Sequence, residues 1–200
     1  MKEFLMMIAS AVVAYTIPKL LESIEGALTP ARTDKLPLPW FQWLLACLIG
    51  GVLGGGISAV MGPQGQANFG NWAAFGACLG IMQWFALRSY LPVGGWWALA
   101  SALGWGTYVI AGNNPIGWSI AGLMVGILQI LGLKVTGKGW WIGGNLIAWT
   151  LVALIGLALW GPINNTFGPA LGWLTAWGLA ALIAGVVLLL PLSRLTPTAK

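Results

Sequence analysis

Histidine is absent from this sequence of 200 residues, and no aspartate or glutamate follows Asp34. The two cysteines, Cys47 and Cys78, lie inside apolar runs and form neither a disulfide framework nor a metal-ligand spacing. General acid–base catalysis most often uses a positioned histidine or carboxylate. Proton-coupled transporters and acidic cation channels need ionisable residues inside the membrane. The sequence therefore predicts a protein that is not an enzyme, and it predicts no metal site.

Charge of either sign is scarce in this chain. Only 6% of the residues are charged, whereas a typical soluble domain has about 25%. Hydrophobic residues make up 58%, glycine adds 30 residues, and the mean hydropathy is +0.86. A chain with so little polar surface is expected to fold in lipid. The net charge of +5 is spread thinly and forms no basic patch, which excludes nucleic acid as a partner.

Six apolar segments follow residue 39, and a bilayer-spanning helix needs about 20 such residues. They cover residues 40–61, 71–88, 95–111, 115–133, 139–160 and 169–192. Their apolar residues run continuously rather than alternating, which favours helices over a β-barrel. We predict an all-α integral membrane protein. Its membrane domain, residues 40–194, would hold six transmembrane helices as three tandem parallel hairpins, at about 40–88, 96–134 and 140–194.

The connections between these segments are of two kinds. Those at 62–70, 112–114 and 161–168 are neutral and rich in Gly, Pro and Asn. The others carry Arg88, Lys134 and Lys138, while Arg194 precedes a short tail at 195–200. By the positive-inside rule the charged loops and the C-terminus face the cytoplasm. Arg88, Lys134 and Arg194 are interpreted as topology determinants that contact lipid headgroups, with anionic-lipid or partner docking as the alternative.

Residues 1–39 are predicted to form a hydrophobic helix and a polar linker. Only residues 4–17 are continuously apolar, which is short for a span. The segment is interpreted as an interfacial helix or a seventh span, with a signal peptide as a further alternative.

The chain also repeats itself. Residues 71–88 match residues 117–134 at an offset of 46, and residues 95–105 match residues 139–149 at an offset of 44. Small residues four apart recur within and beside these copies, and such pairs let helix backbones approach closely in lipid. We expect eight glycines to pack helices together: Gly50, Gly51, Gly54, Gly55, Gly76, Gly80, Gly122 and Gly126.

Tryptophan is abundant, with 14 residues. Four indoles follow charged loops, where they are predicted to anchor at the headgroup level, namely Trp96, Trp97, Trp140 and Trp141. Trp105 and Trp149 lie nine residues deeper. They are interpreted either as core packing or as a flat surface for a pigment, quinone or sterol.

Four polar residues recur inside the apolar segments at similar depths: Gln83, Ser101, Gln129 and Asn145. An amide in hydrocarbon must find a partner, so we expect these residues to hydrogen-bond neighbouring helices. The alternative is a ligand, water or pigment site. The candidate cofactor-binding residues are Gln83, Gln129, Asn145, Trp105 and Trp149, and lipid, carotenoid or chlorophyll are the ligands considered. The sequence requires none of them.

One stretch carries a resemblance. The pattern Gln83-Trp84-x-x-Leu87-Arg88, followed by Gly95-Trp96-Trp97 and Gly104-Trp105-Gly106, resembles uncharacterised Trp/Gly-rich multi-pass membrane proteins of cyanobacteria and related phototrophic bacteria. The resemblance covers about residues 71–150. It implies a bacterial inner or thylakoid membrane and an association with photosynthetic complexes. It supplies no catalytic residues.

Three functions follow from this interpretation. The first is a non-enzymatic accessory or scaffold subunit of a bacterial membrane complex, with membrane lipids and other integral membrane subunits as partners. The alternatives are a conduit for a neutral solute or lipid, and a membrane protein that binds a pigment or hydrophobic cofactor.

Overall fold

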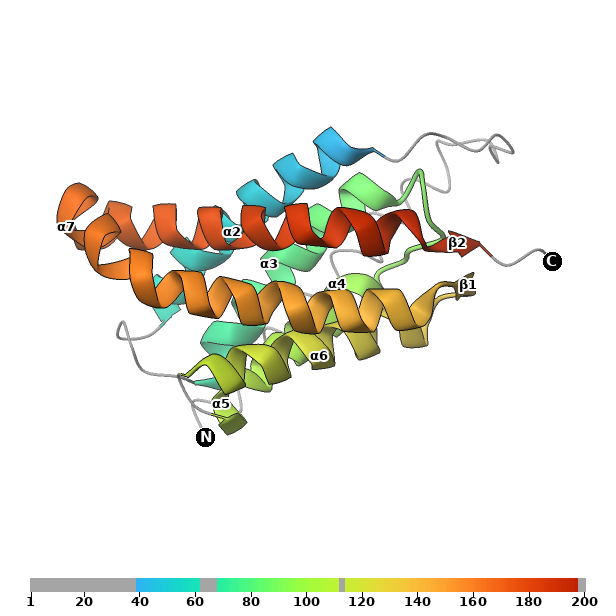
Figure 1. Ribbon diagram of the computed structural model, residues 1–200, viewed down its shortest axis with the longest axis horizontal. Helices are drawn as coiled ribbons and strands as arrows, with labels where there is room; N and C mark the ends of the chain where they lie inside the picture. The colour runs from blue at the N-terminus through green and yellow to red at the C-terminus, as the bar shows by residue number, and fades with distance from the viewer. Residues whose placement is uncertain (1–38, 62–67, 112–113, 198–200) are drawn as a thin grey trace.

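The computed structural model describes residues 39–61, 68–111 and 114–197, and these residues are almost entirely helical (Figure 1). The helices are α2 (Trp40–Met61), α3 (Phe69–Leu87), α4 (Trp96–Gly106), α5 (Tyr108–Ala111), α6 (Pro115–Leu131) and α7 (Lys138–Ser193). Two short strands, β1 (Val135–Thr136) and β2 (Thr196–Pro197), complete the list. The hydrophobic helix predicted near the N-terminus lies outside the described residues.

Three helical segments among the described residues are long and apolar enough to cross a membrane. They are Trp40–Met61, Lys138–Gly156 and Ala170–Ser193. Pro115–Leu131 is apolar but shorter. The structure therefore agrees with an all-α protein whose helices suit a membrane.

Helix α7 contains a sharp reversal. Its first half, Lys138–Gly156, and its second half, Ala170–Ser193, run side by side in opposite directions (Figure 1). The backbone leaves the helical region at Gly168, where φ is 76° and ψ is 168°. Glycine adopts this conformation without a steric penalty. The prediction of a loop over 161–168 is therefore wrong for most of that range, because the helix continues to Gly168.

The segment predicted as one helix over 95–111 is divided in two. Helix α4 ends at Gly106 and the four-residue α5 begins at Tyr108. Thr107, between them, donates its hydroxyl to the carbonyl of Gly104 and shares its backbone N–H between the carbonyls of Leu103 and Gly104. These local bonds compete with continuation of the helix, so the segment is two short helices.

The helices form a closed ring of contacts. Contacts run from α2 to α3, then to α4, α6 and α7, and from α7 back to α2. Gly122 of α6 packs on the first half of α7 at Asn145, and Gly185 in the second half packs on Cys47 of α2. Segments far apart in the sequence thus enclose one interior.

Glycine makes these close contacts possible. A Cβ atom on Gly54 would lie 2.9 Å from the carbonyl oxygen of Phe75, and one on Gly122 would lie 2.7 Å from that of Asn145. Such distances leave no room for a side chain. An added Cβ would also meet an atom within 3 Å at five more of the glycines expected to pack helices, Gly50, Gly51, Gly55, Gly76 and Gly80, while at Gly126 the nearest atoms lie at 3.1 Å.

The repeat extends to the helix caps. Asn68 accepts a hydrogen bond from the backbone N–H of Asn71 at 2.9 Å, and Asn114 accepts one from Gly117 at 3.0 Å. Both asparagines occupy the N-cap position, where a side-chain oxygen satisfies a free N–H group. Helices α3 and α6 therefore begin in the same way, 46 residues apart.

Candidate functional site

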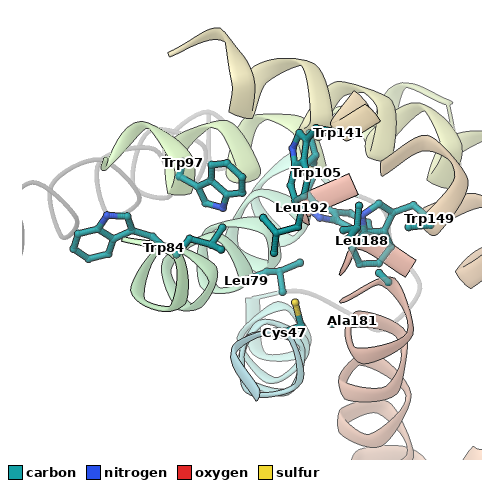
Figure 2. Close-up of a cluster of buried hydrophobic side chains, with 14 of the residues drawn as sticks. Cys47, Leu79, Trp84, Trp97, Trp105, Trp141, Trp149, Ala181, Leu188 and Leu192 are labelled. Atoms are coloured by element: carbon teal, nitrogen blue, oxygen red, sulfur yellow. The ribbon is translucent and has the colours of Figure 1, made fainter. Parts of the chain in front are cut away.

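Two layers of side chains, all buried except the partly buried Trp118, occupy the interior of the ring of helices. The first, which we call the polar layer, consists of Cys47, Gln83, Ser101, Gln129 and Asn145 together with Trp97 and Trp141. The second, the aromatic cluster, consists of Trp72, Phe75, Trp105, Tyr108, Trp118, Trp149 and Trp177. Figure 2 shows several of these side chains converging from different helices on the interior.

Gln83 of α3 joins three helices in the polar layer. Its side-chain oxygen accepts the indole N–H of Trp97 in α4 at 3.2 Å. Its Nε2 donates to Sγ of Cys47 in α2 at 3.6 Å. The amide is 5% exposed, so these contacts replace the water that it would bind at a surface.

Gln129 of α6 repeats this arrangement. Its oxygen accepts the indole N–H of Trp141 in α7 at 3.0 Å. Its Nε2 donates to the hydroxyl of Ser101 in α4 at 2.9 Å, and also lies 3.5 Å from Oε1 of Gln83. The two glutamines therefore meet one another and link α2, α3, α4, α6 and α7.

The remaining members of the polar layer follow a tryptophan by four residues. Cys47 follows Trp43, Ser101 follows Trp97, and Asn145 follows Trp141. Ser101 donates its hydroxyl to the carbonyl of Trp97, and Asn145 donates its amide to the carbonyl of Trp141. Sequence reasoning missed Cys47, although its spacing from Trp43 is the signal that could have found it.

The aromatic cluster lies toward the opposite ends of the same helices. Trp118 and Trp177 stack with centroids 5.1 Å apart and ring planes at 3°. Trp105 and Trp149 pack edge to face, with ring centroids 4.4 Å apart and ring planes at 89°. Rings in stacked and edge-to-face pairs attract one another beyond the area they bury. The Tyr108 hydroxyl accepts the indole N–H of Trp118 at 3.2 Å. Together these ring contacts fill this part of the interior.

Three indoles of the cluster, Trp105, Trp149 and Trp177, each have a glycine opposite them. A Cβ on Gly76 would lie 2.8 Å from Cβ of Trp105, and one on Gly122 would lie 2.8 Å from Cβ of Trp149. The contact of α2 with α7 has the same order, because Gly55 of the earlier helix faces Trp177 of the later one, again at 2.8 Å. The same Gly–Trp contact therefore recurs at three helix pairs of the bundle.

Three indoles in the cluster lack a hydrogen-bond acceptor in the part of the chain that the structure describes. They are Trp72, Trp105 and Trp177, and each is more than nine-tenths buried. An aromatic face is a weak acceptor for such an N–H group, and edge-to-face contacts surround all three. Ring packing rather than hydrogen bonding therefore holds these side chains.

The four indoles predicted as headgroup anchors fall into two groups. Trp140 is 59% exposed, and half-buried Trp96 donates to the carbonyl of Leu128 at 2.6 Å. Trp97 and Trp141 are buried and bond the two glutamines. The anchor prediction is wrong for Trp97 and Trp141, because consecutive helix residues point about 100° apart and the second of each pair faces inward.

The cations predicted to determine topology are near helix ends. Arg88 is the C-cap of α3 and its guanidinium lies 5.0 Å from the ring centroid of Phe85. Arg194 is the C-cap of α7 and lies 5.9 Å from the ring centroid of Trp140. Lys134 follows α6 and is exposed. Because the ends of α3 and α6 meet through Gln83 and Gln129, the two cations that follow them lie at one end of the ring.

Comparisons of the chain with protein-family models, curated proteins and solved structures find no match. The candidate site is therefore interpreted from its own geometry.

Proposed function

We propose that this protein is a non-enzymatic scaffold or accessory subunit of a bacterial membrane complex, embedded as three tandem hairpins of six membrane-crossing segments. The observation that supports this proposal best is the use of the interior. Gln83 and Gln129 bond each other and the surrounding indoles and hydroxyl, and the Gly–Trp contacts fill the aromatic cluster. Side chains that bond internally stabilise a fold rather than present chemistry to a substrate.

The outer surface supports the same proposal. Large apolar side chains are exposed along α2 and along both halves of α7. Examples are Leu53, Ile57, Val60, Leu151, Leu154 and Leu190. Such a surface suits lipid and the helices of other membrane subunits, where close packing and interhelical contacts give association.

The sidedness of the bundle is also part of the proposal. Four cations lie at the polar-layer end of the bundle: Arg88, Lys134 and Arg194 each follow a helix, and Lys138 begins α7. The connection at Gly168 lacks charge. The positive-inside rule places the charged end on the cytoplasmic side of an inner or thylakoid membrane.

The two alternatives have less support. A conduit would need free polar groups along a path, yet both glutamine oxygens accept indole N–H groups. A pigment would need a face of the cluster open to it, yet Trp105 and Trp149 are 0% and 2% exposed. A carotenoid or lipid tail bound on the outer surface needs neither a polar path nor an open aromatic face. Such binding is also compatible with a scaffold.

Site-specific photo-crosslinking in native membranes tests the scaffold proposal. A benzophenone side chain at Val60 of α2, at Leu151 in the first half of α7, or at Leu190 in the second half samples three exposed positions. We expect one position to give a protein adduct of one defined mass while another gives only lipid adducts. Lipid adducts alone from all three positions, with the chain migrating alone in mild detergent, would contradict the proposal.

A further inference from the structure

The strands β1 and β2 bring together two parts of the chain that the sequence separates. They pair antiparallel, with Val135 opposite Pro197 and Thr136 opposite Thr196. The Thr136 and Thr196 hydroxyls form a hydrogen bond across the ladder at 2.5 Å. Gly137 follows with φ 77° and lies so close to the carbonyl oxygen of Arg194 that no side chain would fit there. The start of α7 and its end are therefore fixed side by side.

This ladder gathers cationic and aromatic side chains on one exposed surface. Lys138 and Trp140 begin α7, and Arg194 caps its end. All three are exposed, and the Arg194 guanidinium lies 5.9 Å from the centroid of the Trp140 ring. We call Lys138, Trp140 and Arg194 the ladder patch.

We propose that the ladder patch docks the phosphate headgroup of an anionic membrane lipid. The two cations attract an anion, and the sequence has no aspartate or glutamate from residue 35 to its end. A guanidinium donates to phosphate through paired N–H groups. An exposed indole beside it is the side chain that favours the headgroup level of a bilayer.

The inference rests on the proposed membrane embedding, because that embedding brings the ladder to headgroup depth. Residues 138 and 194 are 56 positions apart in the sequence, and only the pairing of β1 with β2 brings them close together. A lipid held here would contact both ends of α7 and would reinforce the ladder.

Native mass spectrometry of the full chain in detergent provides the test. Phosphatidylglycerol and phosphatidylcholine are added in equal amounts, and bound lipids are counted for the wild type, Lys138→Gln, Arg194→Gln and Trp140→Leu. The matched control is Arg88→Gln, which removes one positive charge from the same end of the ring. We expect preferential binding of phosphatidylglycerol, weakened about fivefold by Arg194→Gln or Lys138→Gln and less by Arg88→Gln.

Several outcomes would overturn the inference. Equal binding of the two lipids would do so, as would equal losses in Arg194→Gln and Arg88→Gln. Displacement of the lipid by millimolar inorganic phosphate would show that the ladder patch binds a free anion rather than a lipid headgroup.

The membrane embedding itself is tested separately. Cell membranes are washed with alkaline carbonate before the protein is extracted. A chain that stays in the membrane but shows no lipid preference overturns only the ladder patch, whereas a chain released by the wash overturns the proposed function.

Discussion

Nε2 of Gln129 lies 3.5 Å from Oε1 of Gln83, although the two residues are 46 positions apart and hold the same place in two copies of the repeat. Each glutamine oxygen also accepts an indole N–H from the helix that follows it. The copies are therefore joined through their repeated polar residue, and this contact connects the bundle's internal symmetry to its stability.

Replacing Gln129 with leucine is expected to destabilise the bundle. The change leaves the indole N–H of Trp141 without its acceptor and removes the amide that donates to Ser101. A buried group left unpaired costs about 1–3 kcal/mol. Thermal unfolding in detergent measures the effect. Combining the change with Gln83→Leu should give less than the sum of the two losses, since the residues share a bond, and strict additivity would contradict a joint network.

Replacing tryptophan with phenylalanine separates the two layers. Trp141→Phe removes the donor to Gln129, whereas Trp105→Phe removes an N–H group that has no acceptor in the described residues. Both changes lose similar volume from a fully buried position. We expect Trp141→Phe to lower the free energy of unfolding by about 1 kcal/mol more than Trp105→Phe does. Equal losses in the same unfolding assay would show that the indole bonds contribute nothing.

The glycine contacts give a third prediction. Gly122→Ala pushes a methyl group against Asn145 and Trp149, so we expect a loss of about 1–3 kcal/mol. Gly143 on α7 has nothing within 4 Å of an added Cβ. Gly143→Ala is expected to be neutral or stabilising by up to about 1 kcal/mol, because alanine favours the helix. Chemical unfolding of both variants compares them, and a cost at Gly143 as large as at Gly122 would contradict the packing described.

Much of the helical pattern was predictable because long apolar runs with glycine pairs have few other solutions in lipid. The prediction of a helix over 40–61 is confirmed at both ends by α2. The break at Thr107 was not predicted, since it depends on local hydrogen bonds to Gly104 rather than on hydropathy. The continuation of α7 to Gly168 was missed because Gly, Pro and Asn in 161–168 favour loops in general.

The site was predictable in composition but not in arrangement. Repetition of Gln83 and Gln129 indicated equal depth, and their need for partners followed from burial. Their actual partners, Trp97 and Trp141, were expected at the surface, because depth in a membrane does not determine which way a side chain points. The contact between the two strands depends on residues 60 positions apart, and local periodicity gives no information about such pairing.

A conduit and a packed bundle differ in permeability. Because the described interior is filled by the polar layer and the aromatic cluster, we expect liposomes holding the protein to release a neutral solute such as glycerol no faster than empty liposomes. Gln83→Leu combined with Gln129→Leu should leave that rate unchanged. Protein-dependent flux abolished by the double change would instead support a pathway lined by the amides.

The central claim, that this chain works through contacts with other membrane subunits, is tested most directly by its particle mass in native membranes. Membrane patches are cut out with an amphipathic polymer, without detergent, and purified through a tag on this chain. The account predicts particles that contain this 21.1 kDa chain together with other integral membrane proteins in a fixed ratio. Particles that contain only this chain and lipid would contradict it.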